Sequence, residues 1–418
     1  MKDNSASIKL TIDRLQPGVY IKLPVRWNAH PFMFNQFKIT SQNQIALLKQ
    51  ANIKHVYAIP SKSDAHPLPV KEDSAPANVE AEQDTTLLKN KLSDKEQQIL
   101  AMQQHRRAIK ECEQAYQNAL SKVRSLTSKV QSRPLVAMDE AQGVMATMTK
   151  ALLGKDDLVL HLVGDDRDDM DSHQHAVSVS VLAMMIGKKI GLRESEISDL
   201  GTAGLLHDIG KLKIPSQFYT SKDVTPAKRK FVIEKHPEYS IEFINNVPSI
   251  NNNVKRLISE HHEYADGSGY PKGLTKDKLH PHSLIISMVN LYENLCYPYD
   301  ESKARTPAQS LSYLFASKKS QFDEKQLSAF VKSLGIYPPG TLVKLNNGQI
   351  GIVITVNTAK LLAPCVMIFD EKIPRDEAAI IDLDQEQVTI ESALSPRSVE
   401  PHIKNYLNPR SQLSFFIE

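Results

Sequence analysis

The sequence His207-Asp208-Ile209-Gly210-Lys211 is followed further along the chain by His261-His262-Glu263-Tyr264-Ala265-Asp266-Gly267-Ser268-Gly269-Tyr270-Pro271. Imidazole and carboxylate side chains together suit iron, manganese, zinc and similar divalent ions. The whole chain contains only 14 histidines, so an adjacent His-Asp pair and an adjacent His-His pair are an unusual concentration of metal ligands. These two stretches therefore predict a metal centre.

Helical periodicity brings further ligand candidates to this centre. Asp171 and His175 lie four residues apart, so a helix would turn both side chains the same way. The apolar segment 197–206 ends at His207, which would place the His-Asp pair at the inner end of a core helix. We therefore expect the ligands to converge from several helices.

Residues 171–335 resemble the HD-GYP family, a branch of the HD-domain metallophosphohydrolases. The resemblance rests on several motifs that occur in the family's order. The last of them occupies the position where the family has its final metal-binding segment. These motifs are His175, His207-Asp208 with Ile209-Gly210-Lys211, His236-Pro237-Glu238, His261-His262-Glu263 through Gly269-Tyr270-Pro271, and Met288 to Leu295. Residues 8–60 resemble the small domain of unknown function that is often fused ahead of HD-GYP domains.

The resemblance implies hydrolysis of the bacterial second messenger cyclic di-GMP to pGpG or GMP, with two or three divalent metal ions, commonly iron or manganese. Asp208 would bridge two ions, and Lys211 would contact the substrate phosphate or stabilise the transition state. Glu263 would either orient a ligand histidine or be solvated. The implied metal ligands are His175, His207, Asp208, His236, His261, His262 and the residue at 290, with Asp171 as an acidic ligand for a third ion. The implied border of the substrate pocket is Gly267, Gly269 and Tyr270.

The chain departs from the family pattern at Asn290, where the family has an aspartate ligand. An Asn carbonyl oxygen can coordinate a metal, but it carries no charge, which would weaken the site and raise the pKa of bound water. Ser240, Leu284 and the stretch 297–301 also differ from the family. Two alternatives to a cyclic di-GMP phosphodiesterase follow: a catalytically impaired domain that binds a cyclic dinucleotide or another signalling protein, and a phosphodiesterase for a related cyclic dinucleotide such as cyclic GMP-AMP.

Composition argues against a nucleic-acid-binding or membrane protein. The net charge is +3, from 51 basic and 48 acidic residues, which gives no electrostatic reason to expect a nucleic acid polymer or a membrane surface as partner. The three cysteines are far apart in the sequence, which favours reduced thiols. No apolar run approaches the roughly 18 residues that a membrane span needs, so we expect no membrane insertion and a cytoplasmic location.

The 418 residues predict a mainly α protein of several domains. An all-helical bundle of the HD type would lie at the centre, with a small α+β domain before it and a small β appendage after it. The hairpin signature Asn346-Asn347-Gly348 lies in that appendage. The predicted divisions are an α+β domain at 8–60, a disordered linker at 61–86, a long amphipathic helix at 87–133, the catalytic domain at 135–338, helical throughout, the β appendage at 339–392 and a tail at 393–418.

The amphipathic helix has two interpretations. Its apolar residues, from Ile99 through Tyr116 and Leu120 to Val130, recur at spacings of three, four and seven. That stripe would either pair with its counterpart in a homodimer through residues 87–130 or pack against the chain's own catalytic domain.

Overall fold

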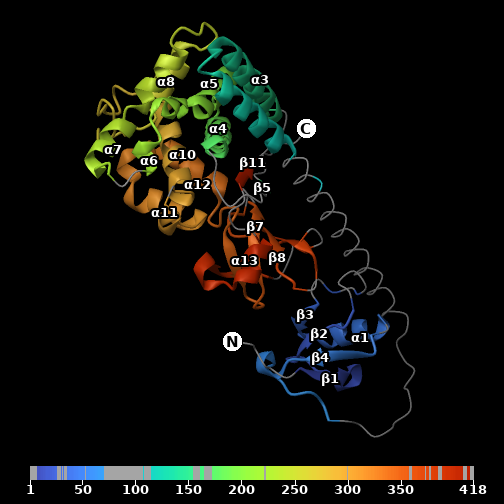
Figure 1. The fold of residues 1–418 in the computed structure, drawn as a ribbon. Coiled ribbons are helices and arrows are strands. Elements are labelled where there is room, and N and C mark those ends of the chain that lie inside the picture. Colours follow the sequence, from blue (N-terminus) through green and yellow to red (C-terminus); the bar gives the residue numbers. More distant parts are fainter. Residues whose placement is uncertain are drawn as a thin grey trace. The chain divides into compact units, whose positions relative to one another are not determined.

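The fold is that of a computed structural model, which divides into two compact units, 1–105 and 106–418 (Figure 1). The structure describes residues 7–25, 30, 32, 35–51, 53–69, 107, 114–153, 161–163, 172–220, 223–298, 300–356, 360–371, 373–375, 378–384, 388–407 and 412–414.

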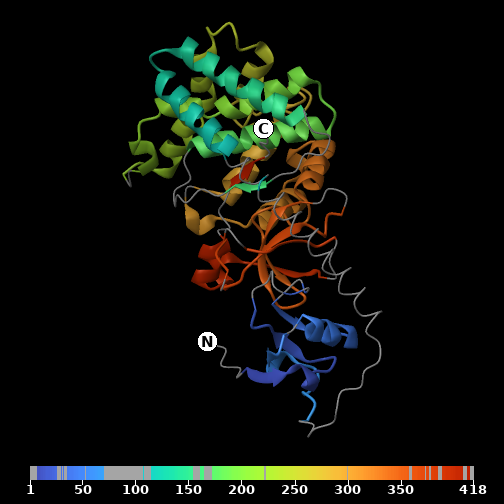
Figure 2. The same cartoon turned by 90° about the vertical axis from the view of Figure 1, so that its right-hand side faces the viewer.

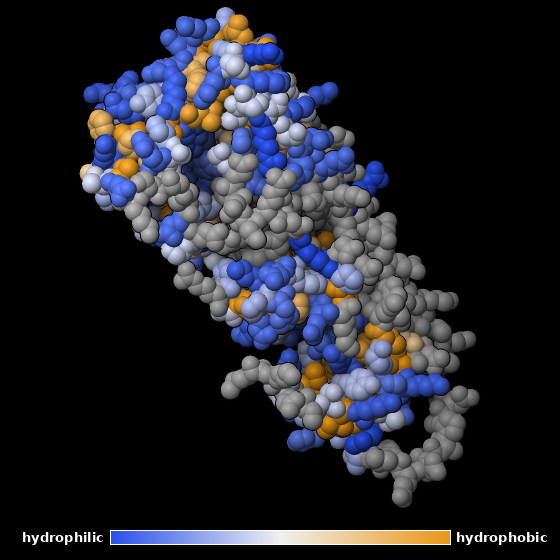
Figure 3. Space-filling model, in the orientation of Figure 1, coloured by the Kyte–Doolittle hydropathy of each residue, from blue (hydrophilic) through white to orange (hydrophobic). Residues whose placement is uncertain are grey.

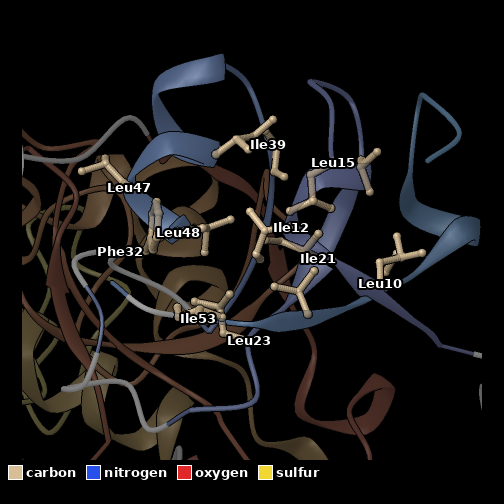
Figure 4. Close-up of a cluster of buried hydrophobic side chains, with 14 residues drawn as sticks. Leu10, Ile12, Leu15, Ile21, Leu23, Phe32, Ile39, Leu47, Leu48 and Ile53 are labelled. Atoms are coloured by element: carbon tan, nitrogen blue, oxygen red, sulfur yellow. The ribbon is translucent and has the colours of Figure 1, made fainter. Parts of the chain in front are cut away.

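The first unit contains a four-stranded antiparallel sheet with the order β1-β4-β2-β3. Its elements are β1 (Ile8–Thr11), η1 (Ile12–Arg14), β2 (Tyr20–Lys22), β3 (Gln36–Lys38), α1 (Gln42–Gln50), β4 (His55–Ala58) and η3 (Pro60–Lys62). Its core consists of aliphatic residues from the strands, from α1 and from the segments between them, together with Phe32. Ten of these core residues are labelled in Figure 4. The predicted small α+β domain is therefore present.

This unit continues past residue 60, where we predicted a disordered linker. The backbone N–H groups of Asp64 and Leu68 donate to the carbonyls of Gly18 and Arg14. Ala65 approaches Gly18 so closely that a Cβ on Gly18 would lie 2.8 Å from the Ala65 Cβ. The predicted linker start is thus too early, because backbone pairing between distant residues leaves no sign in a Ser- and Pro-rich sequence.

The second unit begins with part of the predicted amphipathic helix. Tyr116, Leu120, Val123, Leu126 and Val130 are all at most 2% exposed within a single chain. Their burial favours the intrachain interpretation for this part of the stripe over pairing with a second copy. Residues 87–106 and 108–113 lie outside the described residues. The next helix begins at Pro134, whose fixed φ and missing N–H suit a first helical turn.

The helical bundle forms the centre of this unit (Figures 1 and 2). Helix α4 is its innermost element: all residues from Gln174 to Gly187 are buried, in contact with α3, α5, α10 and α12. An all-round apolar sequence predicts this position, since no face of such a helix can be left to water. The helices of the bundle are α3 (Pro134–Leu153), α4 (Ser172–Lys189), α5 (Glu194–Leu206), η4 (Ile209–Lys213), α6 (Gln217–Thr220), α7 (Pro226–Ile233), α8 (His236–Ile244), α9 (Asn252–Ser259), α10 (Ser283–Cys296), η5 (Glu301–Lys303), α11 (Pro307–Ser317), η6 (Lys319–Gln321) and α12 (Glu324–Leu334).

The prediction that this region is helical throughout is wrong in two places. Strand β5 (His161–Val163) lies between α3 and α4, and residues 260–282 form turns between α9 and α10. The turns contain Gly267 and Gly273, both at positive φ. Glycine adopts this conformation without the strain that a Cβ would add, so the chain reverses there instead of continuing a helix.

The predicted β appendage is a five-stranded antiparallel sheet with the order β10-β6-β7-β8-β9. The hairpin predicted at Asn346–Gly348 joins the two strands of this sheet that come first in the sequence, 342–345 and 350–355, with Gly348 at a φ of 82°. The strands are β6 (Leu342–Leu345), β7 (Ile350–Thr355), β8 (Cys365–Ile368), β9 (Ile380–Asp382) and β10 (Ile390–Leu394).

The segment after residue 392 is not a simple tail. It contains the end of β10, the short helices η8 (Pro396–Ser398) and α13 (Pro401–Leu407), and strand β11 (Gln412–Ser414). Strand β11 pairs antiparallel with β5, so the last described residues join the helical bundle just before α4. A three-residue strand is too short to show a periodic pattern, which is why the sequence did not predict it.

The described helices of the bundle expose a mixed surface. In the view of Figure 3 hydrophilic residues predominate on it, with hydrophobic residues in scattered places. None of the described helices combines the length and the apolar character that crossing a membrane would require.

Candidate metal centre

The helical bundle gathers predicted ligands from the three helices α4, α8 and α10 and from the turns that follow α5 and α9. His175 lies on α4 and Asn290 on α10, while His236 is the first residue of α8. His207 and Asp208 directly follow α5, and His261 and His262 directly follow α9. The centre is buried, since His207 and His261 are 0% exposed and Asn290 is 2% exposed.

Asp208 lies between two groups of imidazoles. Its Oδ1 atom is 3.1 Å from His236 Nε2 and 3.8 Å from His261 Nε2. Its Oδ2 atom is 3.3 Å from His207 Nε2 and 3.7 Å from His175 Nε2. We call these the Oδ1 side (His236, His261 and His262) and the Oδ2 side (His175, His207 and Asn290). On each side the imidazole and carboxylate donor atoms lie within 4.8 Å of one another.

Backbone carbonyls fix the protonation of three of these imidazoles. The Nδ1 atoms of His207, His236 and His261 lie 2.7, 2.6 and 2.6 Å from the carbonyl oxygens of Gly204, Ile233 and Ile258. Each is the carbonyl three residues earlier, which the end of the preceding helix or turn leaves unpaired. A neutral ring that donates through Nδ1 has its lone pair at Nε2. The three lone pairs therefore point toward Asp208.

Burial disfavours the charged form of three imidazoles in this centre, those of His175, His261 and His262. Burial and the neighbouring His207 lower the pKa of His175 to about 3. Burial and neighbouring histidines likewise hold the pKa of His261 and of His262 well below the ordinary value. For Asp208 burial raises the pKa, but the interactions with His207 and Lys211 outweigh it, and its pKa lies well below the usual range. The centre thus offers neutral imidazoles at His175, His261 and His262 beside an ionised carboxylate.

This donor set fits divalent metal ions. His236 Nε2 is 3.0 Å from His261 Nε2, and His175 Nε2 is 3.2 Å from His207 Nε2. Asp208 Oδ1 is buried and accepts no hydrogen bond from the described residues. Acceptor atoms that converge in this way repel one another unless a cation lies among them, and imidazole with carboxylate is a common ligand set for such ions.

Asn290 faces this centre through its oxygen. Its Oδ1 atom is 3.0 Å from His175 Nε2 and accepts a 2.7 Å hydrogen bond from Asn294 Nδ2. The side chain at 290 is therefore in the place where the family resemblance expects a ligand. It offers a neutral amide oxygen there instead of a carboxylate.

Lys211 contacts the centre directly. It follows Asp208 within a 3-10 turn, and its Nζ donates to Asp208 Oδ2 at 2.5 Å. The side chain is 36% exposed, so it lies at the rim of the site and not in its interior.

The turn that follows His262 closes over it. Tyr270 stacks on His262 with ring centroids 4.4 Å apart and an interplanar angle of 19°. Gly269 is necessary for this arrangement, because a Cβ there would lie 2.4 Å from the Cα of Glu263. Gly267, at a φ of 77°, makes the bend just before it. Gly269 and Tyr270 therefore lie beside His262, and Gly267 bends the turn that contains them.

Glu263 does neither of the things predicted for it. It is 0% exposed, and its carboxylate accepts hydrogen bonds from the backbone N–H groups of Lys272 and Leu274. It therefore holds the turn that contains Tyr270. Both partners are backbone groups in an irregular segment, which a sequence pattern cannot indicate.

Two further supporting residues were not predicted. Ser240, one of the departures from the family, accepts a hydrogen bond from Gly210 N and donates to the His207 carbonyl, both at 2.8 Å. Glu260 accepts from His280 N and from Ser283 Oγ at the start of α10, both at 2.7 Å. Ser240 thus ties α8 to the His-Asp turn, and Glu260 ties the end of α9 to the helix that contains Asn290.

A pocket of about 540 Å³ opens beside this centre. Tyr270 lines it and also stacks on His262, so the pocket borders the Oδ1 side. The other lining residues are Val224, Pro226, Arg229, Lys230, Ile233 and Glu234. Asp171, predicted as a ligand for a third ion, lies outside the described residues.

Comparison with known proteins agrees with this architecture. Residues 158–325 match the family model described as HD domain, and residues 7–141 match a domain of unknown function, DUF3391. The chain is therefore an HD-domain protein with an N-terminal DUF3391 domain.

Several curated relatives are phosphodiesterases by name. The chain is 25% identical to cyclic di-GMP phosphodiesterase PA4108 of Pseudomonas aeruginosa over 86% of this chain and 84% of the relative. It is 26% identical to cyclic di-GMP phosphodiesterase PdeB of Borreliella burgdorferi over 46% of this chain and 50% of the relative. It is 28% identical to 3'3'-cGAMP-specific phosphodiesterase 2 of Vibrio cholerae over 36% of this chain and 29% of the relative.

Proposed function

We propose that this HD-domain protein is a metal-dependent phosphodiesterase that hydrolyses cyclic di-GMP to pGpG or GMP. The observation that carries the proposal is the position of Asp208, whose two oxygens face two separate groups of imidazoles. A carboxylate in that position suits a site with two metal ions. The names of the relatives, among them one that the chain matches over 84% of its length, support cyclic di-GMP as the substrate.

In this proposal the Oδ1 side holds one ion through His236, His261, His262 and Asp208. The Oδ2 side holds the other through His175, His207, Asp208 and Asn290, and we propose iron or manganese at both. Bound metal ions supply Lewis acidity and a nucleophile at neutral pH. Asp171 is the candidate ligand for a third ion.

The chain's own residues would position the substrate. Lys211, three residues after Asp208 and at the rim of the site, would hold a phosphate oxygen by charge and hydrogen bonding. The pocket beside Tyr270 offers the basic side chains Arg229 and Lys230, which suit an anionic dinucleotide. Gly267 and Gly269 would border the bound substrate through the turn that contains Tyr270.

Turnover of cyclic di-GMP by the purified protein tests this proposal. The protein is reconstituted anaerobically with Fe²⁺ or Mn²⁺, the doubly substituted His207→Ala/Asp208→Ala chain serves as the blank, and chromatography follows pGpG and GMP. Product above the blank is the expected result. Absence of product from protein that still binds metal would overturn it.

Asn290 favours a second candidate function, that of a cyclic dinucleotide receptor. A neutral ligand leaves the Oδ2 side with less negative charge, which reduces the fraction of activated water. In the same assay, binding of cyclic di-GMP without turnover would indicate the receptor. Faster turnover of 3'3'-cGAMP in a parallel reaction would instead change the assigned substrate, an alternative suggested by the relative in Vibrio cholerae.

A further inference from the structure

We propose that Asn294 is a positioning residue that orients the amide of Asn290, so that its oxygen and not its nitrogen faces the metal centre. The proposal rests on the ligand role of Asn290 in the proposed function and adds the residue that makes a neutral ligand workable. It follows from two hydrogen bonds within α10.

A carboxylate needs no such orientation, because either of its oxygens can bind a cation. An amide has two different ends: the oxygen accepts a metal ion, and the NH₂ group excludes one. An asparagine at position 290 therefore functions as a ligand only while its Oδ1 points at His175 and its neighbours. Something in the structure has to distinguish the two ends.

Asn294 makes that distinction because one of its partners, the backbone carbonyl oxygen of Asn290, can act only as an acceptor. Its Nδ2 lies 2.9 Å from the backbone carbonyl oxygen of Asn290, one helical turn earlier. A carbonyl oxygen only accepts, so this contact fixes which end of the Asn294 amide is the donor. The same Nδ2 lies 2.7 Å from the Asn290 side chain. Because that side chain receives a donor, its oxygen has to lie there.

The oriented oxygen then faces the ligands of the Oδ2 side. Asn290 Oδ1 is 3.0 Å from His175 Nε2, and that Nε2 is 3.2 Å from His207 Nε2. Asn290 is 2% exposed, whereas Asn294 is exposed at the surface of α10. Replacing Asn294 consequently leaves the buried side chains of α10 in place, and its effect on metal binding can be separated from an effect on folding.

A double-mutant cycle on Mn²⁺ affinity tests the proposal. Calorimetry measures Mn²⁺ binding to the wild-type chain, Asn294→Ala, Asn290→Asp, and the variant with both substitutions. Loss of one orienting hydrogen bond in the wild-type background is expected to weaken Mn²⁺ binding by about three- to tenfold. In the Asn290→Asp background the same Asn294→Ala substitution is expected to change the affinity by less than about twofold, because a carboxylate presents an oxygen either way.

Controls separate the loss of Asn290 orientation from any general effect of replacing an exposed helical asparagine. Asn405→Ala removes another exposed helical asparagine, on α13, and is expected to leave Mn²⁺ affinity unchanged. Thermal unfolding of the metal-free variants checks that each one folds, and electron paramagnetic resonance of bound Mn²⁺ reports its ligand environment independently of turnover.

Each other outcome overturns a defined part of the argument. An equal loss of affinity from Asn294→Ala in both backgrounds would mean that Asn294 supports α10 without orienting its neighbour. No loss in the wild-type background would mean that the amide is held by other contacts. If Asn290→Ala leaves Mn²⁺ binding unchanged, Asn290 is not a ligand and the inference fails, while turnover of cyclic di-GMP still decides the proposed function on its own.

Discussion

The two sides of Asp208 differ in how firmly their ligands are fixed. On the Oδ1 side, His236 and His261 donate through Nδ1 to backbone carbonyls, and Tyr270 stacks on His262. On the Oδ2 side, His207 has such a carbonyl partner, but the buried Nδ1 of His175 has no hydrogen-bond partner among the described residues. Outer partners set the tautomer and orientation of ligand imidazoles. We therefore expect the Oδ1 side to bind its ion more tightly.

The fourth donor increases this difference. The Oδ1 side consists of three imidazoles and the shared carboxylate, whereas the Oδ2 side has two imidazoles, the same carboxylate and the neutral oxygen of Asn290. Among the described residues, the Oδ2 side has two such outer partners, the Gly204 carbonyl and Asn294, and the Oδ1 side has three, the carbonyls of Ile233 and Ile258 and the ring of Tyr270. The side with fewer of these partners is also the one that departs from the family pattern, at Asn290.

Removal of the shared residue has the largest expected effect. Asp208→Ala takes a ligand from both sides at once, so we expect turnover of cyclic di-GMP to fall by roughly a thousandfold, about 4 kcal/mol in transition-state free energy. Metal content measured by plasma mass spectrometry should fall on both sides. His236→Ala and His175→Ala serve as one-sided controls, and if Asp208→Ala loses no more metal than either of them, the two sides do not share it.

The pH dependence of stability tests the surroundings of Asn290 on the Oδ2 side. Burial raises the pKa of Glu293, one turn beyond Asn290 on α10, from the ordinary 4.5 to about 8. The folded protein therefore binds this proton more strongly than the unfolded chain does. The stability from protonated Glu293 is complete below pH 4.5 and is lost as the pH rises to about 8, with a slope of up to about 1.4 kcal/mol per pH unit.

Glu293→Gln should remove that slope, since glutamine does not titrate. Urea unfolding of the metal-free protein between pH 5 and pH 8 measures it for both chains. Parallel curves for the wild-type chain and the variant would contradict the prediction.

Ser240 tests the support of the His-Asp turn. Ser240→Ala leaves the buried N–H of Gly210 without its acceptor, so we expect the free energy of unfolding to fall by about 1 to 3 kcal/mol. Chemical denaturation measures the change. Ser128→Ala, which removes an exposed hydroxyl bonded to the Ser125 carbonyl, is the matched control and should change stability by less than about 0.5 kcal/mol. Equal losses from the two variants would show that the Ser240 contacts have no special weight.

Restoring the family's carboxylate at position 290 has the smallest expected effect. Asn290→Asp should tighten Mn²⁺ binding on the Oδ2 side by about tenfold, or 1.4 kcal/mol, because a carboxylate attracts the cation more strongly than an amide does. Binding on the Oδ1 side should stay nearly the same. Calorimetry with two resolved binding steps distinguishes the two, and an equal gain in both steps would break the comparison between the sides.

The candidate ligands could be named from the sequence because the resemblance to the HD-GYP family matches them position by position. His207 and Asp208 also adjoin an apolar helix, and His261 and His262 precede a turn rich in glycine. The structure brings six of the candidates together.

The supporting contacts could not be predicted in that way. Glu263 accepts from backbone groups nine and eleven residues later, and Ser240 bonds to residues of another helix end. Their side chains are ordinary in composition, and only the meeting of distant backbone segments gives them a role. Strands β9 and β11, of three residues each, are likewise too short for periodicity to indicate.

The pairing of β11 with β5 has a consequence for how the chain acquires its structure. The two strands are separated by about 250 residues, so closing this contact requires nearly the whole of the second unit to have been synthesised. Contacts of such high sequence separation form late and slow the folding reaction. During translation, β5, which precedes α4 and His175 in the chain, consequently waits for its partner strand until β11 has left the ribosome.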